Sequence, residues 1–343
     1  LFGGVIPITG ITFLMFCVFA IAAVGYALGR ITIKGVCLGD AAVFVMALVF
    51  GALFYQPLEA QLSAEVTDKA LTIIENLGLI LFVTSVGFIA GPNFFKNLAK
   101  NFKTYIVMGI LIILLGTLVA VICTLLTSYG PAYWSGVLSG ALTSTPGFSA
   151  AIDAVGSDEA VKSLITLGHA IAYPFGVVGV VLFVQLMPKF LKADMDKERD
   201  YLRVGATEEK RDYSKFFKCE DFGFLPFGLA VIAGLILGSV TIPLTGAGYG
   251  GATFSLGTTG GVLIMCLVFG HFGHIGKLSL EVKDSTLKVM REFGLALFLL
   301  GAGVHGGVSL VEQISKFGGG IVAWGFIGGA LMTLVPMFVG FFL

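Results

Sequence analysis

Ten long apolar windows constrain the fold of this chain more than any other feature. Each holds about 20 residues, the length at which an α-helix crosses the hydrocarbon core of a bilayer. They lie at residues 11–29, 41–56, 71–91, 104–128, 133–152, 163–188, 222–238, 257–275, 292–308 and 319–343. Only 12% of the 343 residues are charged, against about 25% in an average soluble domain. Because backbone groups in lipid must hydrogen-bond within their own segment, we expect an all-α polytopic membrane protein.

One strongly polar stretch, residues 189–221, divides the apolar windows into two groups. It contains KADMDKERDYLRVGATEEKRD and is too short to be a sizeable domain. We therefore expect a first transmembrane repeat over residues 1–188, a polar linker over 189–221 and a second repeat over 222–343.

The two halves repeat the same phrases in the same order. LGRITI at 28–33 returns as LGSVTI at 237–242, and LVFG at 48–51 returns unchanged at 267–270. GLILFVTSVGFIAG at 78–91 aligns without gaps to GLALFLLGAGVHGG at 294–307. Three collinear phrases with similar spacing indicate an internal repeat of about five transmembrane helices, with shared membrane composition as the alternative.

Basic residues occupy different loops in the two copies. In the first copy they follow the first and third windows, at Arg30, Lys34, Lys96, Lys100 and Lys103. In the second copy the loop after LGSVTI has no charge, and the next loop carries Lys277, Lys283, Lys288 and Arg291. Because basic loops stay in the cytoplasm, the copies should face opposite ways, with the linker cytoplasmic. Inverted repeats are typical of secondary transporters, whose substrate site lies near mid-membrane.

The fifth apolar window is interrupted at its polar centre, Thr145-Pro146-Gly147. The side of the membrane predicted for the linker requires an odd number of crossings, so either the fifth or the sixth window should not cross, and the interrupted fifth is the better candidate. We expect this window to be a re-entrant hairpin or a broken helix, with Thr145 as the N-cap of a new short helix and Pro146 in its first turn.

A helix that begins near Pro146 would direct its positive end toward the middle of the bilayer. Backbone N–H groups and hydroxyls there would form an anion site without a buried lysine or arginine. The candidate substrate-binding residues are Gly140, Thr143, Ser144, Thr145, Pro146 and Gly147. The alternative is a helix interface built from small residues, in which Ser and Thr bond across packed helices.

A second glycine-rich phrase, GTTGG, opens the window that contains the repeated LVFG. Gly257, Thr258, Thr259 and Gly260 could add a second set of polar contacts to substrate, or the glycines could serve close helix packing. Asp40 takes the related position in the first copy. It is expected to cap a helix, and the alternative is a cation partner.

Two histidines, His169 and His305, lie well inside apolar windows, where a charge is costly. Either residue, like Asp40, is a candidate for proton or ion coupling. A neutral, hydrogen-bonded histidine is the favoured alternative at both positions.

Motifs for other functions are absent from the sequence. It lacks HExxH, GxSxG, P-loop and CxxC motifs, so we expect no enzyme, no cofactor and no metal. The 21 basic residues balance 21 acidic residues, which leaves no basic field for nucleic acid.

The sequence resembles the aspartate:alanine exchanger family of bacterial antiporters. The resemblance rests on LGRITIKGVCLGDAAVFVMALVFG, LGLILFVTSVGFIAGPNFF, SGALTSTPGFSAA, AIAYPFGVVGVVLF, FSLGTTGGVLIMCLVFGHFG and FGLALFLLGAGVHGG. It implies an inner (plasma) membrane exchanger or exporter of amino acids or dicarboxylates such as aspartate, alanine or succinate, with an elevator-like or rocking cycle. By matching positions, the family's GALTSTP stretch falls on Gly140–Pro146 and its LGTTGG stretch on Leu256–Gly261.

The chain departs from this family in two ways. Many relatives carry paired regulatory domains between the halves, and residues 189–221 leave no room for them. The second copy stops at Leu343 within its fourth segment, so we expect the second repeat to be incomplete.

The sequence therefore predicts a secondary transporter that exchanges small organic anions by alternating access, with the lipid bilayer around it. By analogy it could form a homodimer. Two alternatives stay open: a pathway for an inorganic ion, and a membrane sensor subunit that carries no flux.

Overall fold

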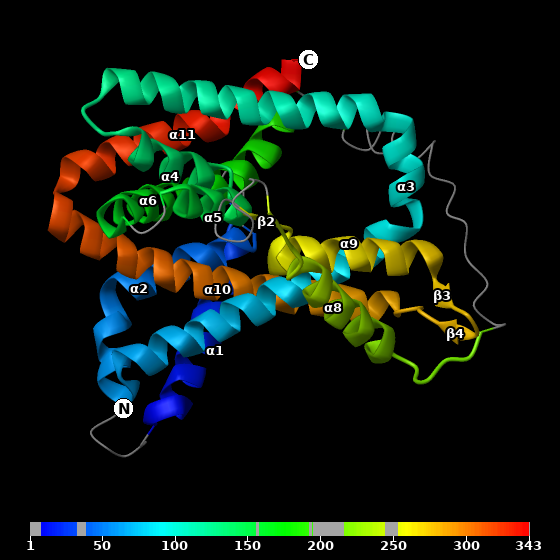
Figure 1. The fold of residues 1–343 in the computed structure, drawn as a ribbon. Coiled ribbons are helices and arrows are strands. Elements are labelled where there is room, and N and C mark those ends of the chain that lie inside the picture. The colour runs from blue at the N-terminus through cyan, green and yellow to red at the C-terminus, as the bar shows by residue number, and fades with distance from the viewer. Residues whose placement is uncertain are drawn as a thin grey trace. The chain divides into compact units, whose positions relative to one another are not determined.

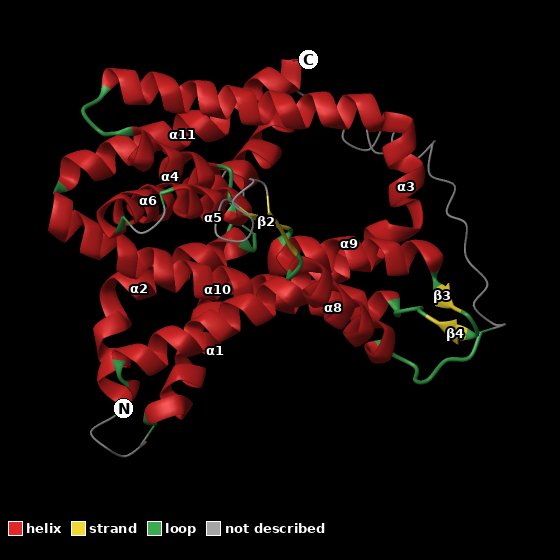
Figure 2. Ribbon diagram, viewed as in Figure 1, coloured by secondary structure: helices red, strands yellow, loops and turns green. Residues whose placement is uncertain are grey.

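The computed structural model describes residues 8–32, 39–155, 158–191, 194, 216–243 and 253–342. Helices dominate this part of the chain (Figure 2). They are α1 (Gly10–Gly29), α2 (Ala41–Leu62), α3 (Ala64–Leu126), α4 (Pro131–Ala141), α5 (Thr145–Ala154), α6 (Glu159–Phe190), α8 (Phe224–Gly238), α9 (Gly257–Phe272), α10 (Asp284–Phe317) and α11 (Gly319–Phe342), as labelled in Figure 1. The linker expected at 189–221 lies mostly outside the described residues.

Two short antiparallel strand pairs connect helices of the second half. Strands β1 (Thr241–Pro243) and β2 (Thr253–Ser255) pair between α8 and α9, with Ile242 opposite Phe254. Strands β3 (His274–Ile275) and β4 (Leu278–Ser279) pair between α9 and α10.

Six helical segments in the described part of the chain are long and apolar enough to cross a membrane. They are Gly10–Gly29, Ala41–Leu62, Ala64–Phe95, Tyr105–Leu126, Asp284–Glu312 and Gly319–Phe341. The most hydrophobic of them, Tyr105–Leu126, has a mean hydropathy of 3.1 and exposes Ile113, Leu114 and Leu125. Apolar side chains exposed on a helix of this length suit contact with lipid. The prediction of an all-α polytopic membrane protein is confirmed.

The chain forms two compact units, and each takes helices from both halves of the sequence. Unit 1 contains Leu1–Asn76, Gly109–Met187 and Ala296–Leu343, and unit 2 contains Leu77–Met108 and Pro188–Leu295. Helices α3 and α10 contribute to both units. The sequence repeats are therefore a different division of the chain from these packing units.

The first two helices of each copy pack through matching residues. In unit 1, Gly25 of α1 lies so close to Val43 of α2 that a Cβ on Gly25 would meet the Val43 Cα at 2.6 Å. In unit 2, Gly234 of α8 makes the same backbone contact with Val262 of α9. Gly25 and Gly234 each lie three residues before LGRITI or LGSVTI, and the two valines each lie five residues before LVFG. The aligned phrases therefore have the same local packing.

The third helix of each copy packs against the second helix of the other copy. In unit 1, Gly303 of α10 faces Ala47 of α2, and in unit 2, Gly87 of α3 faces Cys266 of α9. The two glycines are equivalent in the 14-residue phrase, and Ala47 and Cys266 each immediately precede LVFG. These reciprocal contacts support the internal repeat. The opposite orientation of the copies stays a prediction.

Candidate functional site

The fifth apolar window is a broken helix. Helix α4 ends at Ala141, a turn occupies 142–144, and α5 begins at Thr145 (Figure 1). With 11 and 10 residues, each helix is about 16 Å long, roughly half of the hydrocarbon thickness. The sequence-based prediction of a break is confirmed.

Thr143, at the centre of the break, has a left-handed backbone with φ of 49°. This conformation is unfavourable for a β-branched residue and costs on the order of 1–3 kcal/mol, so surrounding structure must hold it. Part of that support comes from α6, where a Cβ on Gly176 would lie 2.6 Å from the Thr143 Cγ2 and 2.7 Å from the Ala141 carbonyl oxygen. The backbone N–H of Thr143 also donates to the Gly140 carbonyl at 2.9 Å.

Ser144, and not Thr145, caps α5. The Ser144 hydroxyl accepts a hydrogen bond from the Gly147 N–H at 3.1 Å, and the Ser144 carbonyl accepts one from the Phe148 N–H at 2.9 Å. The prediction of Thr145 as the N-cap is one residue late, because the left-handed turn at Thr143 places Ser144 as the last non-helical residue. The side chains of Thr145 and Pro146 lie outside the described part of the structure.

The capping arrangement changes how an anion could bind at α5. Pro146 has no N–H group, and the Gly147 N–H already donates to Ser144. The first turn of α5 therefore does not present the several free backbone N–H groups that the sequence predicted. The Ser144 hydroxyl still has its own proton to donate. The hydrogen bond that it accepts from the Gly147 N–H polarises the hydroxyl.

His169 of α6 contacts both arms of the broken helix. Its Nδ1 lies 2.9 Å from the Ser139 hydroxyl in α4, and its ring centroid lies 4.4 Å from that of Phe148 in α5. Ser139 donates its single hydroxyl proton to the Gly136 carbonyl at 2.8 Å. With the Ser139 proton on the Gly136 carbonyl, the His169 Nδ1 is the donor to Ser139, and Nε2 is an acceptor in the neutral ring.

The carbonyl end of α4 is held by α11. Thr333, which is 3% exposed, shares its single hydroxyl proton between the Ala141 carbonyl at 3.2 Å and the Gly329 carbonyl of its own helix at 2.9 Å. Tyr133 of α4 donates to the Ile321 carbonyl of α11 at 2.7 Å. The contact from Thr333 gives a partner to the Ala141 carbonyl, which lies at the C-terminal end of α4 and has no partner within that helix. Sequence reasoning missed Ser139 and Thr333: Ser139 opens the phrase SGALTSTPGFSAA but was not singled out, and Thr333 lies in none of the quoted phrases.

We use the name broken-helix site for Ser139, Gly140, Thr143, Ser144, Gly147 and His169, which lie together in unit 1. Gly140 joins the site because a Cβ there would collide with the His169 carbonyl of α6. The site keeps four residues of the first predicted substrate-binding cluster: Gly140, Thr143, Ser144 and Gly147. It leaves out Thr145 and Pro146, whose side chains are not described.

The second predicted cluster, at the start of α9, belongs to unit 2. Gly257 begins α9 with φ of +68°, and its carbonyl oxygen touches the position of a Cβ on Gly238. Gly257 therefore serves the close packing of α8 on α9. Thr258 is exposed, and Thr259 and Gly260 are half-buried. A binding role for these three residues stays a prediction.

Asp40 occupies the N-cap position of α2, but its side chain makes no capping hydrogen bond. A capping residue needs an extended backbone, whereas Asp40 is already helical with φ of −65° and ψ of −23°. The expectation of a side-chain cap is therefore wrong.

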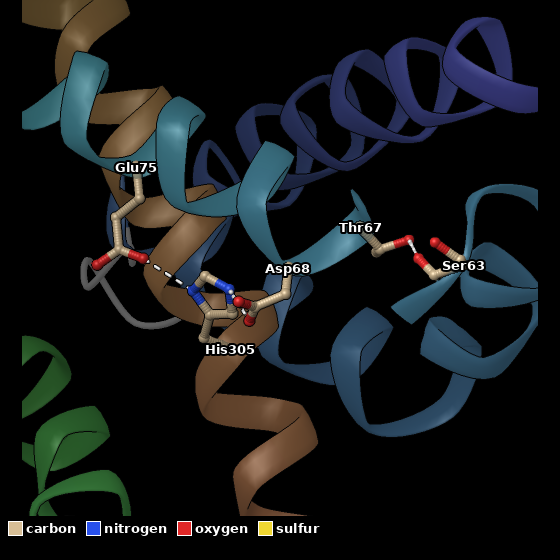
Figure 3. Close-up of polar contacts among 5 residues, drawn as sticks. All are labelled: Ser63, Thr67, Asp68, Glu75 and His305. Atoms are coloured by element: carbon tan, nitrogen blue, oxygen red, sulfur yellow. Dashed lines mark hydrogen bonds and ion pairs between the residues drawn. The ribbon is translucent and has the colours of Figure 1, made fainter. Parts of the chain in front are cut away.

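His305 of α10 lies between two carboxylates of α3 (Figure 3). Its Nδ1 is 2.9 Å from an oxygen of Glu75, and its Nε2 is 3.5 Å from an oxygen of Asp68. The side chains of His305 and Glu75 are each 28% exposed, and that of Asp68 is 65% exposed. We call Asp68, Glu75 and His305 the His305 cluster.

The sequence contains a signal for this cluster that was missed. Glu75 is an acidic residue inside an apolar window, and Asp68 lies seven residues before it, on the same face of one helix. Its pairing with His305 depends on a close approach of two helices. A Cβ on Gly301 would lie 2.5 Å from the Glu75 Cβ, a contact that no local pattern predicts.

Comparison with known proteins identifies the family. The family described as Predicted Permease Membrane Region matches residues 17–189 and 226–343. An uncharacterized transporter, BF2680, of Bacteroides fragilis (strain YCH46) is 40% identical over 189 residues, which cover 55% of this chain and 32% of that protein. A putative transport protein of Glaesserella parasuis serovar 5 (strain SH0165) is 32% identical over 203 residues, covering 56% of this chain and 34% of that protein.

A longer alignment joins both halves of the chain to one relative. The uncharacterized transporter GSU1016 of Geobacter sulfurreducens (strain ATCC 51573 / DSM 12127 / PCA) is 24% identical over 486 positions, covering 94% of this chain and 86% of that protein. The alignments to the Bacteroides and Glaesserella proteins span about a third of those proteins. No solved structure matches the chain. Since the matched ranges cover most of both apolar halves, the chain belongs to the Predicted Permease Membrane Region family, whose relatives named here are described as transporters or transport proteins.

Proposed function

We propose that the protein is a secondary active transporter of the bacterial plasma membrane that exchanges or exports small amino-acid or dicarboxylate anions by alternating access. The broken helix between α4 and α5 carries the proposal, because a helix that starts inside a packed membrane domain offers a positive end to an anion. The relatives described as transporters support the general class.

The Ser144 hydroxyl is the proposed carboxylate donor. It accepts from the Gly147 N–H and so keeps its proton available for a ligand. The strained backbone at Thr143 is held by α6 and places this hydroxyl at the break without a competing helical hydrogen bond. Strain that surrounding packing maintains is typical of functional positions.

His169 is the proposed partner for a second polar group of the substrate. With Nδ1 donating to Ser139, Nε2 is an acceptor and suits the ammonium group of an amino acid. A dicarboxylate such as succinate has no ammonium group, so this contact would distinguish the two substrate classes.

Transport by purified protein in proteoliposomes tests the proposal. Vesicles loaded with aspartate, alanine or succinate are expected to take up the same labelled solute, and empty vesicles are expected to take up much less. Uptake that ignores internal solute and follows an inorganic ion would favour the ion pathway. Failure of every solute to exchange would favour the sensor subunit.

Substitutions at Ser144 test the site itself. Asp is a good N-cap, so Ser144→Asp should keep the start of α5 and abolish anion exchange by repulsion. Ser144→Asn keeps the cap without the charge and should retain exchange with weaker affinity. Ser135→Ala is the control, because Ser135 lies in α4, the other arm of the broken helix, and donates to its own helix at the Ala132 carbonyl, 2.8 Å away. Equal exchange in Ser144→Asp and Ser135→Ala would contradict the proposed site.

A further inference from the structure

We propose that the His305 cluster is a proton-binding and proton-transfer site that couples proton movement to transport. The inference rests on the proposed transport function, and it concerns residues away from the hydroxyls that bind substrate. Ionisable residues inside a membrane-spanning segment are costly and are usually retained for a pathway or a relay. The structure brings three of them together across two helices.

The first step of the argument is the geometry of the imidazole. Each ring nitrogen of His305 faces a different carboxylate, Nδ1 toward Glu75 and Nε2 toward Asp68. An imidazole can accept a proton at one nitrogen and release the proton held at the other. A proton arriving from Asp68 binds Nε2, and the proton on Nδ1 passes to the Glu75 carboxylate, so that the ring is neutral before and after the transfer.

The hydrogen bonds of the ring suit this cycle. The contact between Nδ1 and Glu75 has hydrogen-bond geometry at 2.9 Å. Nε2 is buried and has no hydrogen-bond partner within the described residues, while an Asp68 oxygen lies 3.5 Å away. In a purely structural contact, both ring nitrogens of His305 would form hydrogen bonds. Here one nitrogen is bonded and the other faces a carboxylate at a distance that protonation would shorten.

The second step is the direction of the path. Asp68 lies in the second turn of α3 and is 65% exposed, whereas Glu75 lies seven residues further along and is 28% exposed. Seven residues of helix correspond to about 10 Å. Figure 3 shows His305 reaching both side chains from α10. The cluster therefore links the exposed carboxylate of Asp68 to the less exposed carboxylate of Glu75.

The third step is the environment of the cluster, which is acidic. Among the described residues, Asp68 and Glu75 of α3 act on His305, and Asp68 acts together with Glu59 of α2 and Glu312 of α10 on Tyr55 of α2. Tyr173 of α6 lies within electrostatic range of Glu75, and its ring centroid is 5.5 Å from that of His169 in the broken-helix site. Negative charges on both sides of an imidazole favour proton capture.

Two transport assays in proteoliposomes separate this inference from the proposed function. Exchange of labelled solute at equal pH on both sides needs only the substrate site. Accumulation driven by a pH gradient, with a pH-sensitive dye inside the vesicles, needs the proton path as well. Wild-type protein should show both activities, with proton movement that depends on solute.

The variants His305→Gln and Glu75→Gln should lose at least tenfold in gradient-driven accumulation and keep exchange at equal pH within about twofold. Glu65→Gln is the matched control, since Glu65 also lies near the start of α3 but pairs with Lys69 at 2.6 Å on an exposed surface. It should leave both activities unchanged. Full gradient response in both cluster variants, with or without a loss of thermal stability, would overturn the proposal, as would a strict requirement for Na⁺ in place of protons.

A spectroscopic measurement tests the proton site independently of transport. It applies even if wild-type protein exchanges none of the solutes, a result that would reject the proposed function. Of the four histidines, His305 is identified by the imidazole signal that disappears from ¹⁵N spectra of His305→Gln. That signal should titrate between about pH 5 and pH 8 and should move when Glu75 becomes Gln. A His305 ring that stays in one protonation state from pH 4 to pH 9 would reject the proton site.

Discussion

Gly303 lies against Ala47 so closely that a Cβ on the glycine would meet the alanine Cβ at 2.6 Å. The equivalent pair, Gly87 and Cys266, makes the same contact in unit 2. In both contacts the helices approach so closely that there is no room for a side chain. Each contact therefore depends on a glycine.

Gly303→Ala should destabilise the protein. The added methyl group would force α10 away from α2, and overpacking of this kind costs about 1–3 kcal/mol. Thermal unfolding of the purified protein measures the effect. Gly306→Ala is the control in the same helix, because no described atom outside the adjoining backbone of α10 lies within 4 Å of its Cβ position. Alanine there should stabilise the helix by up to about 1 kcal/mol, and an equal loss in both variants would contradict the packing argument.

Thr143→Asn should raise the free energy of unfolding of the protein by about 1 kcal/mol, and the unfolding temperature with it. Asparagine tolerates the left-handed backbone that Thr143 adopts with φ of 49°. Thr143→Val keeps the branched shape and the strain, so it should give no gain. A drop in the unfolding temperature of Thr143→Asn would show that the contact between Thr143 and Gly176 outweighs the strain.

Ser139→Ala and His169→Phe should change substrate preference. Both variants remove the hydrogen bond between Ser139 and the His169 Nδ1, 2.9 Å apart, but only His169→Phe also removes the Nε2 acceptor. The affinity for alanine or aspartate should fall about tenfold or more in His169→Phe, since a hydrogen bond to a charged group contributes about 1.5–3 kcal/mol. The affinity for succinate should change less. Ligand-dependent thermal shifts measure both, and equal losses for all three solutes would argue against an ammonium contact.

Glu220 should make the stability of the protein sensitive to acid. It lies before α8, outside the membrane-spanning segments, and its carboxylate accepts the N–H groups of Phe222 at 2.7 Å and Leu225 at 3.2 Å. Desolvation acts to raise the pKa of Glu220, but the hydrogen bonds from Phe222, Leu225, Phe224 and Gly223 outweigh it, so the pKa is lower than the usual 4.5.

A lowered pKa in the folded protein gives stability above the unfolded value, and this stability is lost as the pH falls through the folded value. The advantage of wild-type protein over Glu220→Gln should therefore be complete at pH 6 to 7 and decline as the pH falls below the usual pKa of 4.5. Unfolding temperatures across this range measure it, with Asp221→Asn as a control for charge in the same loop. A difference that does not depend on pH would contradict the role of the carboxylate.

Local patterns in the sequence predicted the membrane class, most helix positions and the break near Pro146. These features depend on neighbouring residues. A run of about 20 apolar residues is long enough to span lipid, and a proline removes a backbone donor wherever it lies. The basic loop expected between the windows 71–91 and 104–128 was wrong, because both windows belong to one continuous helix, α3 (Ala64–Leu126). The structure adds that the repeated phrases have like packing: Gly25 meets Val43 as Gly234 meets Val262.

Single-residue details of the break needed the tertiary structure. Ser144 caps α5 in place of Thr145 because α6 packs against Thr143 and holds it in a left-handed turn. Asp40 takes the N-cap position of α2 without the capping bond, because its backbone is already helical.

The sequence by itself determined that this chain is a helical membrane protein with a helix broken at its fifth apolar window. Only the tertiary structure decided that Glu75 and His305, 230 residues apart, form a hydrogen bond. The physical reason is that hydrophobic length and helix interruption are properties of a segment. A pairing between helices depends instead on the backbone approach that small residues such as Gly301 permit, and this approach exists only after packing.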